Sequence, residues 1–320
     1  MRADGAVACL GEAMAVFVPE EARNTHRFLL TVGGAEANVA RHLARLGITV
    51  RWLGAVGADD LGATVLASLR DCGVDVTSTI VDPSRPTALY VKESAPTGSR
   101  MRYYRTGSAC SALGPELLDT VDLSGIGLLH LTGITATLSA SCLDLLRVVT
   151  NRRVPDRLIS FDVNWRPTLW RGKDHRVLTE LANAADVVFV GEDEAEALWG
   201  DGAPSAVRTA LPDPPTVVVK HGARGATLLE DGPTVFQPGL AVDVVEPIGA
   251  GDAFAAGFLA ATLAGAGPRE RLRRGHIAAA AALRSREDVG EPLPPDLVAT
   301  LLAADPDTWA AARIGSGTPR

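Results

Sequence analysis

The segment from Glu246 to Gly257 reads EPIGAGDAFAAG and places two glycines and an aspartate directly ahead of an apolar helix. Exposed N–H groups at a helix start can hold an anion, and Gly249 and Gly251 let the backbone approach a phosphate closely. Asp252 would repel a bound anion, so its position makes sense if it takes a proton from an attacking hydroxyl while the N–H groups stabilise a transferring phosphoryl group. An ordinary helix start with an aspartate cap is the alternative interpretation.

A second glycine pair, Gly33 and Gly34, precedes a helical pattern that ends at Gly47. Asn38 falls in the first turn of this predicted helix. Gly34 would allow a ligand to lie against the backbone, and the Asn38 amide could hydrogen-bond sugar hydroxyls. A structural turn followed by a solvated asparagine explains the same residues.

Polar residues with a spacing of two follow a predicted strand at 158–162. If the chain stays extended, Asp162, Asn164 and Arg166 project to one side, because side chains in a strand alternate. Pro167 favours an extended conformation at Arg166. An arginine at the end of a strand suits bidentate binding of a carboxylate.

The segment 87–106 is predicted to be a hairpin with its turn at 96–99. Alternation puts Tyr103 and Arg105 on one face and Tyr104 on the other, and Tyr90 could join the first pair from the opposite strand. A second arginine beside a tyrosine hydroxyl indicates an acidic sugar as the ligand. A solvated strand with stacked aromatic side chains is the alternative.

The elements that would position these residues alternate along the C-terminal two thirds of the chain. Short apolar runs are interspersed with amphipathic helical patterns, which predicts an α/β fold with a doubly wound, mostly parallel sheet covered on both faces. Ligands bind such sheets at the carboxyl ends of the strands. The predicted strands are 127–131, 158–162, 187–190 and 216–220, and the predicted helices are 139–151, 175–185, 192–199 and 205–211.

The length of the whole chain, residues 1–320, fits one large domain. Segments at about 13–30 and 87–106 resemble antiparallel strands of a small exposed sheet, placed as a lid. Residues 306–320 lose periodicity, so we expect a frayed tail.

Composition excludes several classes of function. A net charge of −7 and the lack of a basic run with aromatic residues argue against nucleic-acid binding. No apolar run reaches membrane-spanning length, and the N-terminus reads as a first strand rather than a signal peptide. The four cysteines are scattered, which indicates reduced thiols and no zinc site, so we expect a cytoplasmic protein.

The two glycine motifs together, Gly-Gly-x-x-x-Asn and Gly-Ala-Gly-Asp, resemble both signatures of the ribokinase-like (PfkB-type) carbohydrate kinases. The resemblance covers nearly the whole chain, including the order of elements and the position of the lid. It implies a three-layer α/β/α fold and a phosphotransferase that uses ATP. It also implies that Asp252 is the catalytic base and that Gly249, Ala250 and Gly251 form the anion hole.

Finer matches resemble the 2-keto-3-deoxygluconate kinase branch of that family. They are the Asp-x-Asn-x-Arg-x-x-Leu-Trp run from Asp162, the Tyr-Tyr-Arg-x-x-Ser-Ala segment from Tyr103 and the opening Gly11-Glu12-x-Met14. The resemblance implies transfer of the γ-phosphoryl group to the sugar 6-hydroxyl. It implies a sugar-acid pocket lined by Gly34, Asn38, Tyr90, Tyr103, Arg105 and Arg166. Asp288 is a candidate for a further polar contact, or else part of a surface Glu-Asp pair.

For the nucleotide, Lys220, Gly222 and Gly225 are similar to the family's Lys-x-Gly-x-x-Gly segment beside the ATP phosphates and ribose. Asn164 is also assigned to the binding of the nucleotide. Glu194 matches the family's glutamate and could bind Mg²⁺ through water.

Two departures from the family pattern concern ions. Gly191 replaces an asparagine three residues before Glu194, so we do not assume the phosphate–metal contact that this asparagine makes in the family. Glu246 replaces the usual aspartate of a monovalent-cation site in related kinases, so we do not assume activation by a monovalent cation.

Other functions fit less well. A dinucleotide-binding oxidoreductase needs Gly-x-Gly-x-x-Gly after the first strand, and a Walker-type NTPase needs Gly-x-x-x-x-Gly-Lys-Ser/Thr; neither occurs. A non-catalytic sugar sensor would not need Asp252. A fructokinase- or ribokinase-type enzyme remains the main alternative within the family. Lid strands of this family often pair between subunits, so we expect a homodimer.

Overall fold

The computed structural model describes residues 5–21, 24–95 and 98–315, and its largest element is an eight-stranded sheet. Its strand order is β14-β13-β12-β11-β10-β9-β1-β4, and all neighbours are parallel except for β13 and β14 at one edge. The strands are β1 (Ala6–Leu10), β4 (Val50–Leu53), β9 (Ile126–Thr132), β10 (Leu158–Asp162), β11 (Val187–Gly191), β12 (Thr216–Lys220), β13 (Gly225–Leu229) and β14 (Val235–Pro238).

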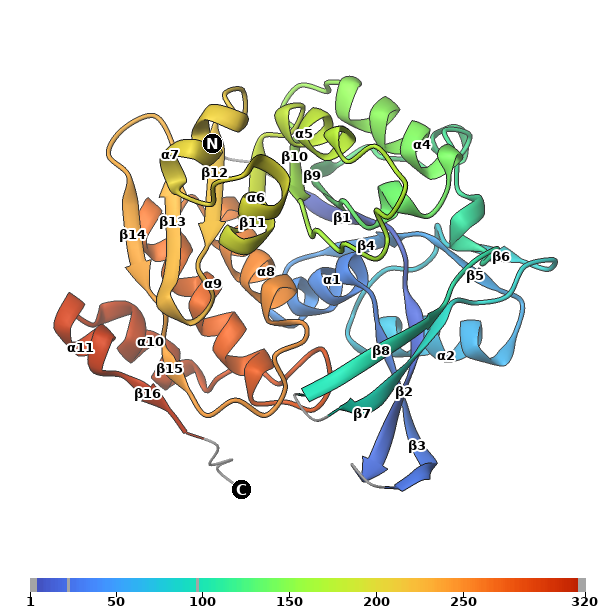
Figure 1. Ribbon diagram of the computed structural model, residues 1–320, viewed down its shortest axis with the longest axis horizontal. Helices are drawn as coiled ribbons and strands as arrows, with labels where there is room; N and C mark the ends of the chain where they lie inside the picture. Colours follow the sequence, from blue (N-terminus) through green and yellow to red (C-terminus); the bar gives the residue numbers. More distant parts are fainter. Residues whose placement is uncertain (1–4, 22–23, 96–97, 316–320) are drawn as a thin grey trace.

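Helices cover both faces of this sheet, as the alternating pattern predicted (Figure 1). Within β12, Val217 and Val219 pack into one core while Val218 packs into the other, so successive side chains supply opposite layers. One face carries α4 (Ala140–Asn151), α5 (Arg176–Asn183), α6 (Glu192–Trp199) and α7 (Pro204–Ala210), and the other carries α1 (Ala35–Arg45), α2 (Asp60–Asp71), α8 (Ala250–Leu263) and α9 (Pro268–Leu283).

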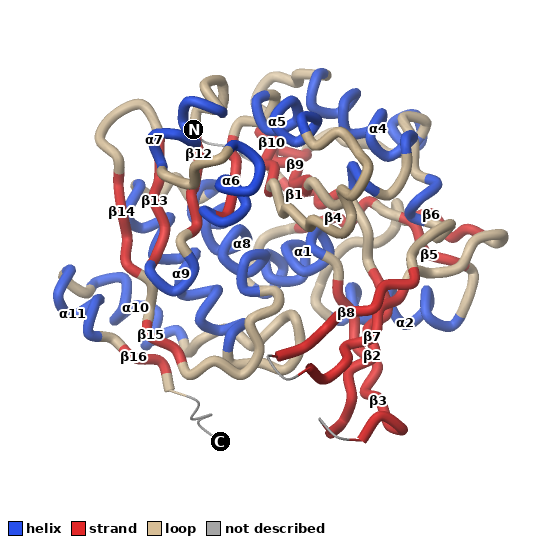
Figure 2. The backbone as a smooth tube through the Cα atoms, viewed as in Figure 1, coloured by secondary structure: helices blue, strands red, loops and turns tan. Residues whose placement is uncertain are grey.

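The remaining elements are short and lie at the edges of these layers (Figure 2). They are β5 (Ala55–Gly57), β6 (Ile80–Asp82), α3 (Leu117–Thr120), α10 (Pro295–Ala303), α11 (Pro306–Ala311), β15 (Ala241–Val242), β16 (Arg313–Ile314) and three short 3₁₀ turns. In the described part of the chain, no helix is both long enough and apolar enough to cross a membrane.

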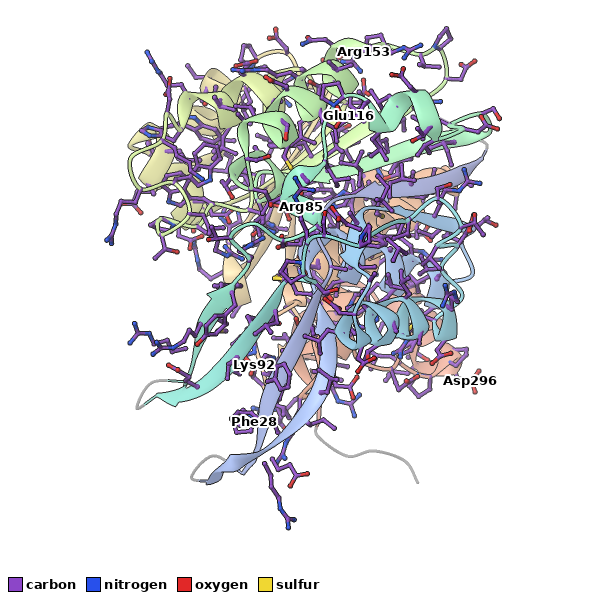
Figure 3. The ribbon with its side chains drawn as sticks, turned by 90° about the vertical axis from the view of Figure 1, so that its right-hand side faces the viewer. Phe28, Arg85, Lys92, Glu116, Arg153 and Asp296 are labelled. Carbon is purple, nitrogen blue, oxygen red and sulfur yellow. The ribbon has the colours of Figure 1, made fainter. Side chains whose placement is uncertain are left out.

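The small sheet, which we call the lid, projects from the body of the molecule (Figure 3). It contains β2 (Met14–Glu21), β3 (Asn24–Gly33), β7 (Leu89–Ala95) and β8 (Gly98–Tyr104) in the order β3-β2-β7-β8. β2, β7 and β8 fall within the two segments that the sequence indicated, whereas β3 continues three residues beyond the first segment. Residues 96–97 of the predicted turn lie outside the described residues. Each hairpin is antiparallel, but β2 and β7 join in parallel, which the expectation of antiparallel strands missed.

Polar contacts fix the start of α1 against the main sheet. The buried Glu36 carboxylate accepts hydrogen bonds from Thr132, the last residue of β9, at 2.8 Å and from Thr135 at 2.6 Å. A Cβ on Gly11 would meet this carboxylate, so a larger residue there would displace Glu36 from its hydrogen bonds. The first turn of α1 is therefore held at the carboxyl edge of the sheet.

The expectation of a frayed tail from residue 306 is wrong for the described residues. Asp305 caps α11 by accepting from the Thr308 N–H at 2.8 Å. Trp309 is fully buried, donates its indole N–H to the Pro238 carbonyl at 2.8 Å and lies 4.6 Å from the Arg273 guanidinium. Residues 306–315 thus pack on β14 and α9, while residues 316–320 lie outside the described chain.

Replacing Trp309 tests this docking of the tail. We expect Trp309→Ala to lower the free energy of unfolding by about 3–5 kcal/mol, because it removes a large buried side chain from a packed interface. Urea unfolding monitored by circular dichroism measures the change. Arg313→Ala is the control: its 3.7 Å ion pair with Asp243 is exposed, so it should shift stability by less than about 1 kcal/mol. Equal effects of the two changes would contradict the packed tail.

Candidate active site

A cavity of about 410 Å³ opens at the carboxyl ends of β10, β11 and β12, between the first turns of α1 and α8 and the lid. This is the edge at which doubly wound sheets bind their ligands. The cavity is lined by Met14, Gly34, Ala35, Asn38, Tyr90, Met101, Tyr103, Arg105, Ile134, Asp162, Asn164, Arg166, Thr168, Leu169, Glu194, Lys220, Pro247, Ile248, Gly249, Gly251, Asp252 and Asp288. Most of the residues singled out from the sequence therefore meet in one place.

Residues 247–251, which we call the anion turn, form one wall of this cavity. Gly249 has φ of 81°, and a Cβ there would stand 2.3 Å from the Asp288 carbonyl oxygen, so the position requires glycine. Gly251 stays open to the cavity, with the Lys220 ammonium 3.7 Å from the place of its missing Cβ. The first N–H groups of α8 have no acceptor within the helix, so the turn presents donors and positive charge together.

Asp252 lies in the first turn of α8 and opens on the cavity. Its carboxylate accepts a hydrogen bond from the Asn38 amide at 2.8 Å. Burial raises the pKa of Asp252 to about 8; the Asp162 and Asp288 charges add to this, while the Asn38 hydrogen bond and Arg166 oppose it. A carboxyl with a pKa this near neutrality can accept a proton from an alcohol far more effectively than an ordinary aspartate.

Lys220 and Asp162 form a buried ion pair beside the anion turn, at 2.9 Å. Burial disfavours the Lys220 ammonium, but the nearby Asp162 and Glu194 carboxylates outweigh it and raise the lysine pKa. The ammonium is thus held charged next to the anion turn, where it can contact a phosphate.

Arg166 and Glu194 lie at the outer rim. The Arg166 guanidinium is 3.5 Å from the Glu194 carboxylate, and its side chain is 52% exposed. The other Glu194 oxygen accepts from the Gly191 N–H at 2.7 Å, at the start of α6. Burial raises the pKa of Glu194. The negative charge of Asp162 raises it further, while the positive charges of Lys220 and Arg166 partly oppose the increase. Arg166 is the cation at this rim that can turn toward a ligand.

The expectation of an extended chain after β10 is wrong at one residue. Asn164 adopts a left-handed conformation with φ of 44°, which asparagine tolerates better than most residues. Asp162, Asn164 and Arg166 nevertheless all line the cavity. The Asn164 side chain is buried and its amide oxygen has no partner, which leaves it available to a ligand.

The lid supplies the opposite wall, and here the alternation is confirmed. Tyr90 and Tyr103 are paired across the hairpin with ring centres 5.3 Å apart, and both line the cavity, while Tyr104 faces solvent. The Arg105 guanidinium lies over the Tyr103 ring at 5.3 Å. Arg105 also forms an ion pair with the buried Glu12, a partner that the sequence did not suggest.

Asp288 and Asn38 are both buried, so the alternatives of a surface Glu-Asp pair and a solvated asparagine are wrong. The Asp288 carboxylate accepts from the Tyr90 hydroxyl at 2.7 Å and from the Lys92 ammonium at 2.9 Å. Lys92 escaped notice although it follows Tyr90 by two residues on the same face of β7, a spacing that could have revealed it.

Gly222 and Gly225 do not line the cavity. A Cβ on Gly225 would stand 2.3 Å from the Gln237 carbonyl oxygen, so this glycine lets β13 approach β14. The predicted contact of both glycines with a nucleotide stays a prediction. Ala250 is the first residue of α8, between Gly249 and Gly251, and does not line the cavity either. The sequence also missed apolar lining residues, among them Ile134 and Leu169.

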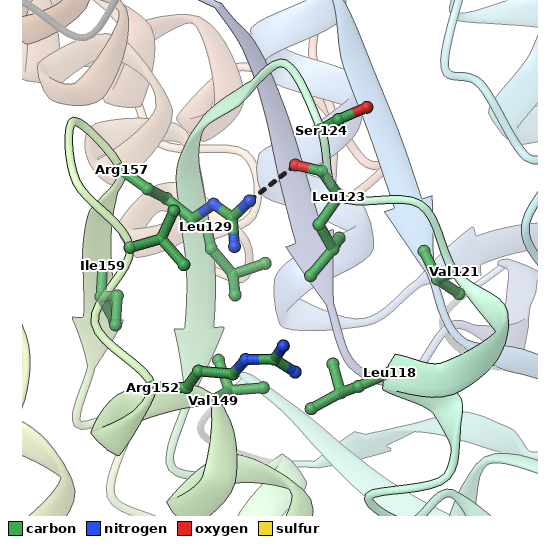
Figure 4. A pocket seen from close by; sticks show the side chains of 10 residues that line it. Leu118, Val121, Leu123, Ser124, Leu129, Val149, Arg152, Arg157 and Ile159 are labelled. Atoms are coloured by element: carbon green, nitrogen blue, oxygen red, sulfur yellow. Dashed lines mark hydrogen bonds between the residues drawn. The ribbon is translucent and has the colours of Figure 1, made fainter.

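A second cavity of about 220 Å³ lies near the amino ends of β9 and β10, at the opposite edge of the sheet (Figure 4). Its lining is apolar apart from Ser124, Arg152 and Arg157, and Arg157 donates to the Leu123 carbonyl at 2.6 Å. None of the residues predicted to carry chemistry lines it, so the cavity at the carboxyl edge is the candidate active site.

Comparisons with known proteins agree with this geometry. The model of the pfkB family of carbohydrate kinases matches residues 5–294. The chain belongs to this family. It is therefore a carbohydrate kinase, and its fold is that of the ribokinase-like sugar kinases, as the sequence motifs implied.

Individual relatives are similar over most of their length. A 2-dehydro-3-deoxygluconokinase of Bacillus subtilis (strain 168) is 35% identical, over 87% of this chain and 90% of the relative. A protein with the same name from Thermoproteus tenax is 35% identical over 82% of each chain. The crystal structure of a PfkB protein from Polaromonas sp. JS666 superposes with a TM-score of 0.81 at 33% identity, covering 94% of this chain and all of that one.

The raised pKa of Asp252 predicts the pH dependence of this kinase. If Asp252 must be ionised to act, kcat/KM for the sugar at saturating nucleotide rises with pH and levels off above about pH 8. Asn38→Ala removes a hydrogen bond to the ionised form of Asp252, so the pKa of Asp252 should rise. The rising limb of the plot of kcat/KM against pH should then move to higher pH. Asp252→Asn is the control and should lose both the limb and most of the turnover. A limb that stays in place in Asn38→Ala would contradict the role of this hydrogen bond.

Proposed function

We propose that this kinase transfers the γ-phosphoryl group of ATP to the 6-hydroxyl of 2-keto-3-deoxygluconate. The observation that carries the proposal is one cavity with Asp252 and the anion turn on one side and two arginines, Arg105 and Arg166, toward the lid and rim. The names of the similar proteins from Bacillus subtilis and Thermoproteus tenax, which are 2-dehydro-3-deoxygluconokinases, support the same substrate.

In this proposal Asp252 accepts the proton of the attacking hydroxyl. Its pKa of about 8 suits that transfer near neutral pH. The N–H groups of the anion turn bind the transferring phosphoryl oxygens, where charge accumulates in the transition state. Lys220, beside Gly251, adds a positive charge at the same place. The lid excludes water, so that transfer to the sugar is favoured over hydrolysis of ATP.

In this proposal the two arginines of the same cavity bind the sugar acid. Arg166 is paired with Glu194 only at 3.5 Å and is half-exposed, so it can turn to form a bidentate contact with a carboxylate. Arg105 is already paired with Glu12 through Nη2, so it contributes mainly a hydrogen bond from Nε, which has no acceptor among the described residues. Asn38 and Tyr103 would contact the sugar hydroxyls.

The residues present fit a magnesium ion that is bound mainly by the nucleotide. Across the described residues, no set of three or more His, Cys, Asp or Glu side chains is grouped to hold a metal. Glu194 lines the cavity with one oxygen engaged at the start of α6, which suits a contact through water. When bound, Mg²⁺ would neutralise charge on the phosphates.

The substrate proposal predicts that Arg166 discriminates acidic from neutral sugars. Arg166→Ala should raise KM for 2-keto-3-deoxygluconate by on the order of 10- to 100-fold, the size of effect expected for a lost charged contact. KM for fructose or ribose should change little. A coupled ADP-release assay over these sugars, gluconate and 2-keto-3-deoxygalactonate measures both constants.

Arg171→Ala is the matched control, since Arg171 is exposed and outside the cavity. Equal losses for the keto acid and for the neutral sugars in Arg166→Ala would contradict the carboxylate contact. Preference of the wild type for fructose or ribose would favour the neutral-sugar alternative, for which the neutralisation of Arg105 by Glu12 is the supporting observation.

We also propose that the kinase forms a homodimer through its lid and acts in the cytoplasm. The outer lid strand β3 carries three consecutive exposed apolar residues, Phe28, Leu29 and Leu30, an unusual surface for a strand left in water. The four cysteines are free thiols, which agrees with a reducing compartment.

A charge on β3 tests the lid interface. Leu29→Glu should convert a dimer to a monomer, because the new carboxylate would be buried without a partner, and sedimentation velocity measures the mass. Arg27→Glu, one residue from the apolar run, is the control and should leave the mass unchanged or nearly so. A wild-type chain that sediments as a monomer would contradict the proposal.

A further inference from the structure

Lys92 is a lid residue that no step of the proposed reaction uses. It lies on β7 (Figure 3), two residues after Tyr90, and its side chain is 3% exposed. Its ammonium is 2.9 Å from the Asp288 carboxylate and 3.8 Å from the Glu246 carboxylate. Burying an ammonium beside two carboxylates costs desolvation free energy, which only close charge pairing and further hydrogen bonds offset.

Both carboxylates belong to segments that shape the anion turn. Glu246 immediately precedes the turn, and its side chain accepts from the Ile248 N–H at 3.4 Å. Asp288 reaches the turn from the other side, because its carbonyl oxygen abuts Gly249. Lys92 is therefore the point at which a lid strand touches the two segments that hold the anion turn.

The lid contributes a second contact to the same group. The Tyr90 hydroxyl donates to the other Asp288 oxygen at 2.7 Å, and this oxygen also lies against Gly33 at the end of β3, where a Cβ would stand 2.6 Å away. Asp288 is thus held between two lid strands and the anion turn. A displaced lid would break these contacts together.

We propose that Lys92 is a positioning residue: its ammonium is a built-in cation that neutralises Glu246 and Asp288 and so couples the lid to the anion turn. Without this charge, the buried Asp288 carboxylate and the partly buried Glu246 carboxylate would repel each other. The turn between them would then lose the position in which its N–H groups meet the phosphoryl group.

The inference rests on the proposed role of the anion turn but not on the identity of the sugar. The assays use the full-length kinase with whichever carbohydrate the wild type phosphorylates fastest. If the substrate proposal is wrong, a different sugar is used in the assay, and the test of Lys92 remains valid.

The first experiment removes the charge and then restores the balance. Lys92→Met should lower kcat on the order of 10- to 100-fold, the loss that small displacements of catalytic groups produce, with a smaller change in KM for ATP. The double variant Lys92→Met/Glu246→Gln removes one of the two opposing carboxylates and should regain at least half of that loss on a logarithmic scale. If the Lys92→Met variant does not fold, the Lys92→Gln variant is used in its place.

The second experiment supplies the cation from solution. In Lys92→Ala the space left between the carboxylates should admit a small cation, so ammonium chloride should raise kcat while tetramethylammonium chloride of equal ionic strength should not. The wild type should respond to neither. Arg102→Gln is the matched control: this lid cation pairs with Glu93 at 2.7 Å on the solvent face and should keep full turnover without added ammonium.

Two results would overturn the inference. Wild-type kcat in both Lys92→Met and Lys92→Gln would show that the charge is not needed. A loss of kcat that neither Glu246→Gln nor ammonium reverses, in a variant with a normal unfolding midpoint, would show that the lysine acts through packing rather than through its charge.

Discussion

Asn38 and Asp252 are 214 residues apart in the chain, and the hydrogen bond between them connects the first turns of two helices. It brings the glycine pair before α1 and the anion turn before α8 to the same cavity. The rest of the site depends on this junction, because the proposed role of Asp252 as a base requires its carboxylate to face both the N–H groups of the anion turn and the sugar. Burial of the same carboxyl raises its pKa to about 8 and makes it a stronger proton acceptor.

Three carboxylates around this junction are each paired with a cation. Glu12 is paired with Arg105, Asp162 with Lys220 and Asp288 with Lys92. In the described part of the chain, Asp252 forms no ion pair and has only a neutral amide as its hydrogen-bond donor. An opposing cation would have stabilised its ionised form and lowered its pKa. The lack of a cation partner therefore distinguishes the proposed base from these three carboxylates.

The lid completes the site through the same kind of contact. Its inner face carries Tyr90, Lys92 and Tyr103, and Asp288 accepts hydrogen bonds from the first two. Because β2 and β7 join the two hairpins in parallel, residues from both lid segments reach the cavity. A family relationship predicts such a lid, but the buried charges show how this chain holds it against the anion turn.

The sequence alone determined what depends on local pattern. Alternating apolar runs indicated the layered sheet, glycine spacing indicated Gly34 and the anion turn, and strand alternation put Tyr103 with Arg105. Tertiary structure decided what depends on long-range contact and burial. Only packing showed that Asp288 and Asn38 are buried, that Glu12 neutralises Arg105, and that Lys92 bridges Asp288 and Glu246. The left-handed turn at Asn164 and the docked Trp309 also escaped local reasoning. The physical reason is that charge pairing and desolvation depend on neighbours that are distant along the chain, whereas periodicity depends only on adjacent residues.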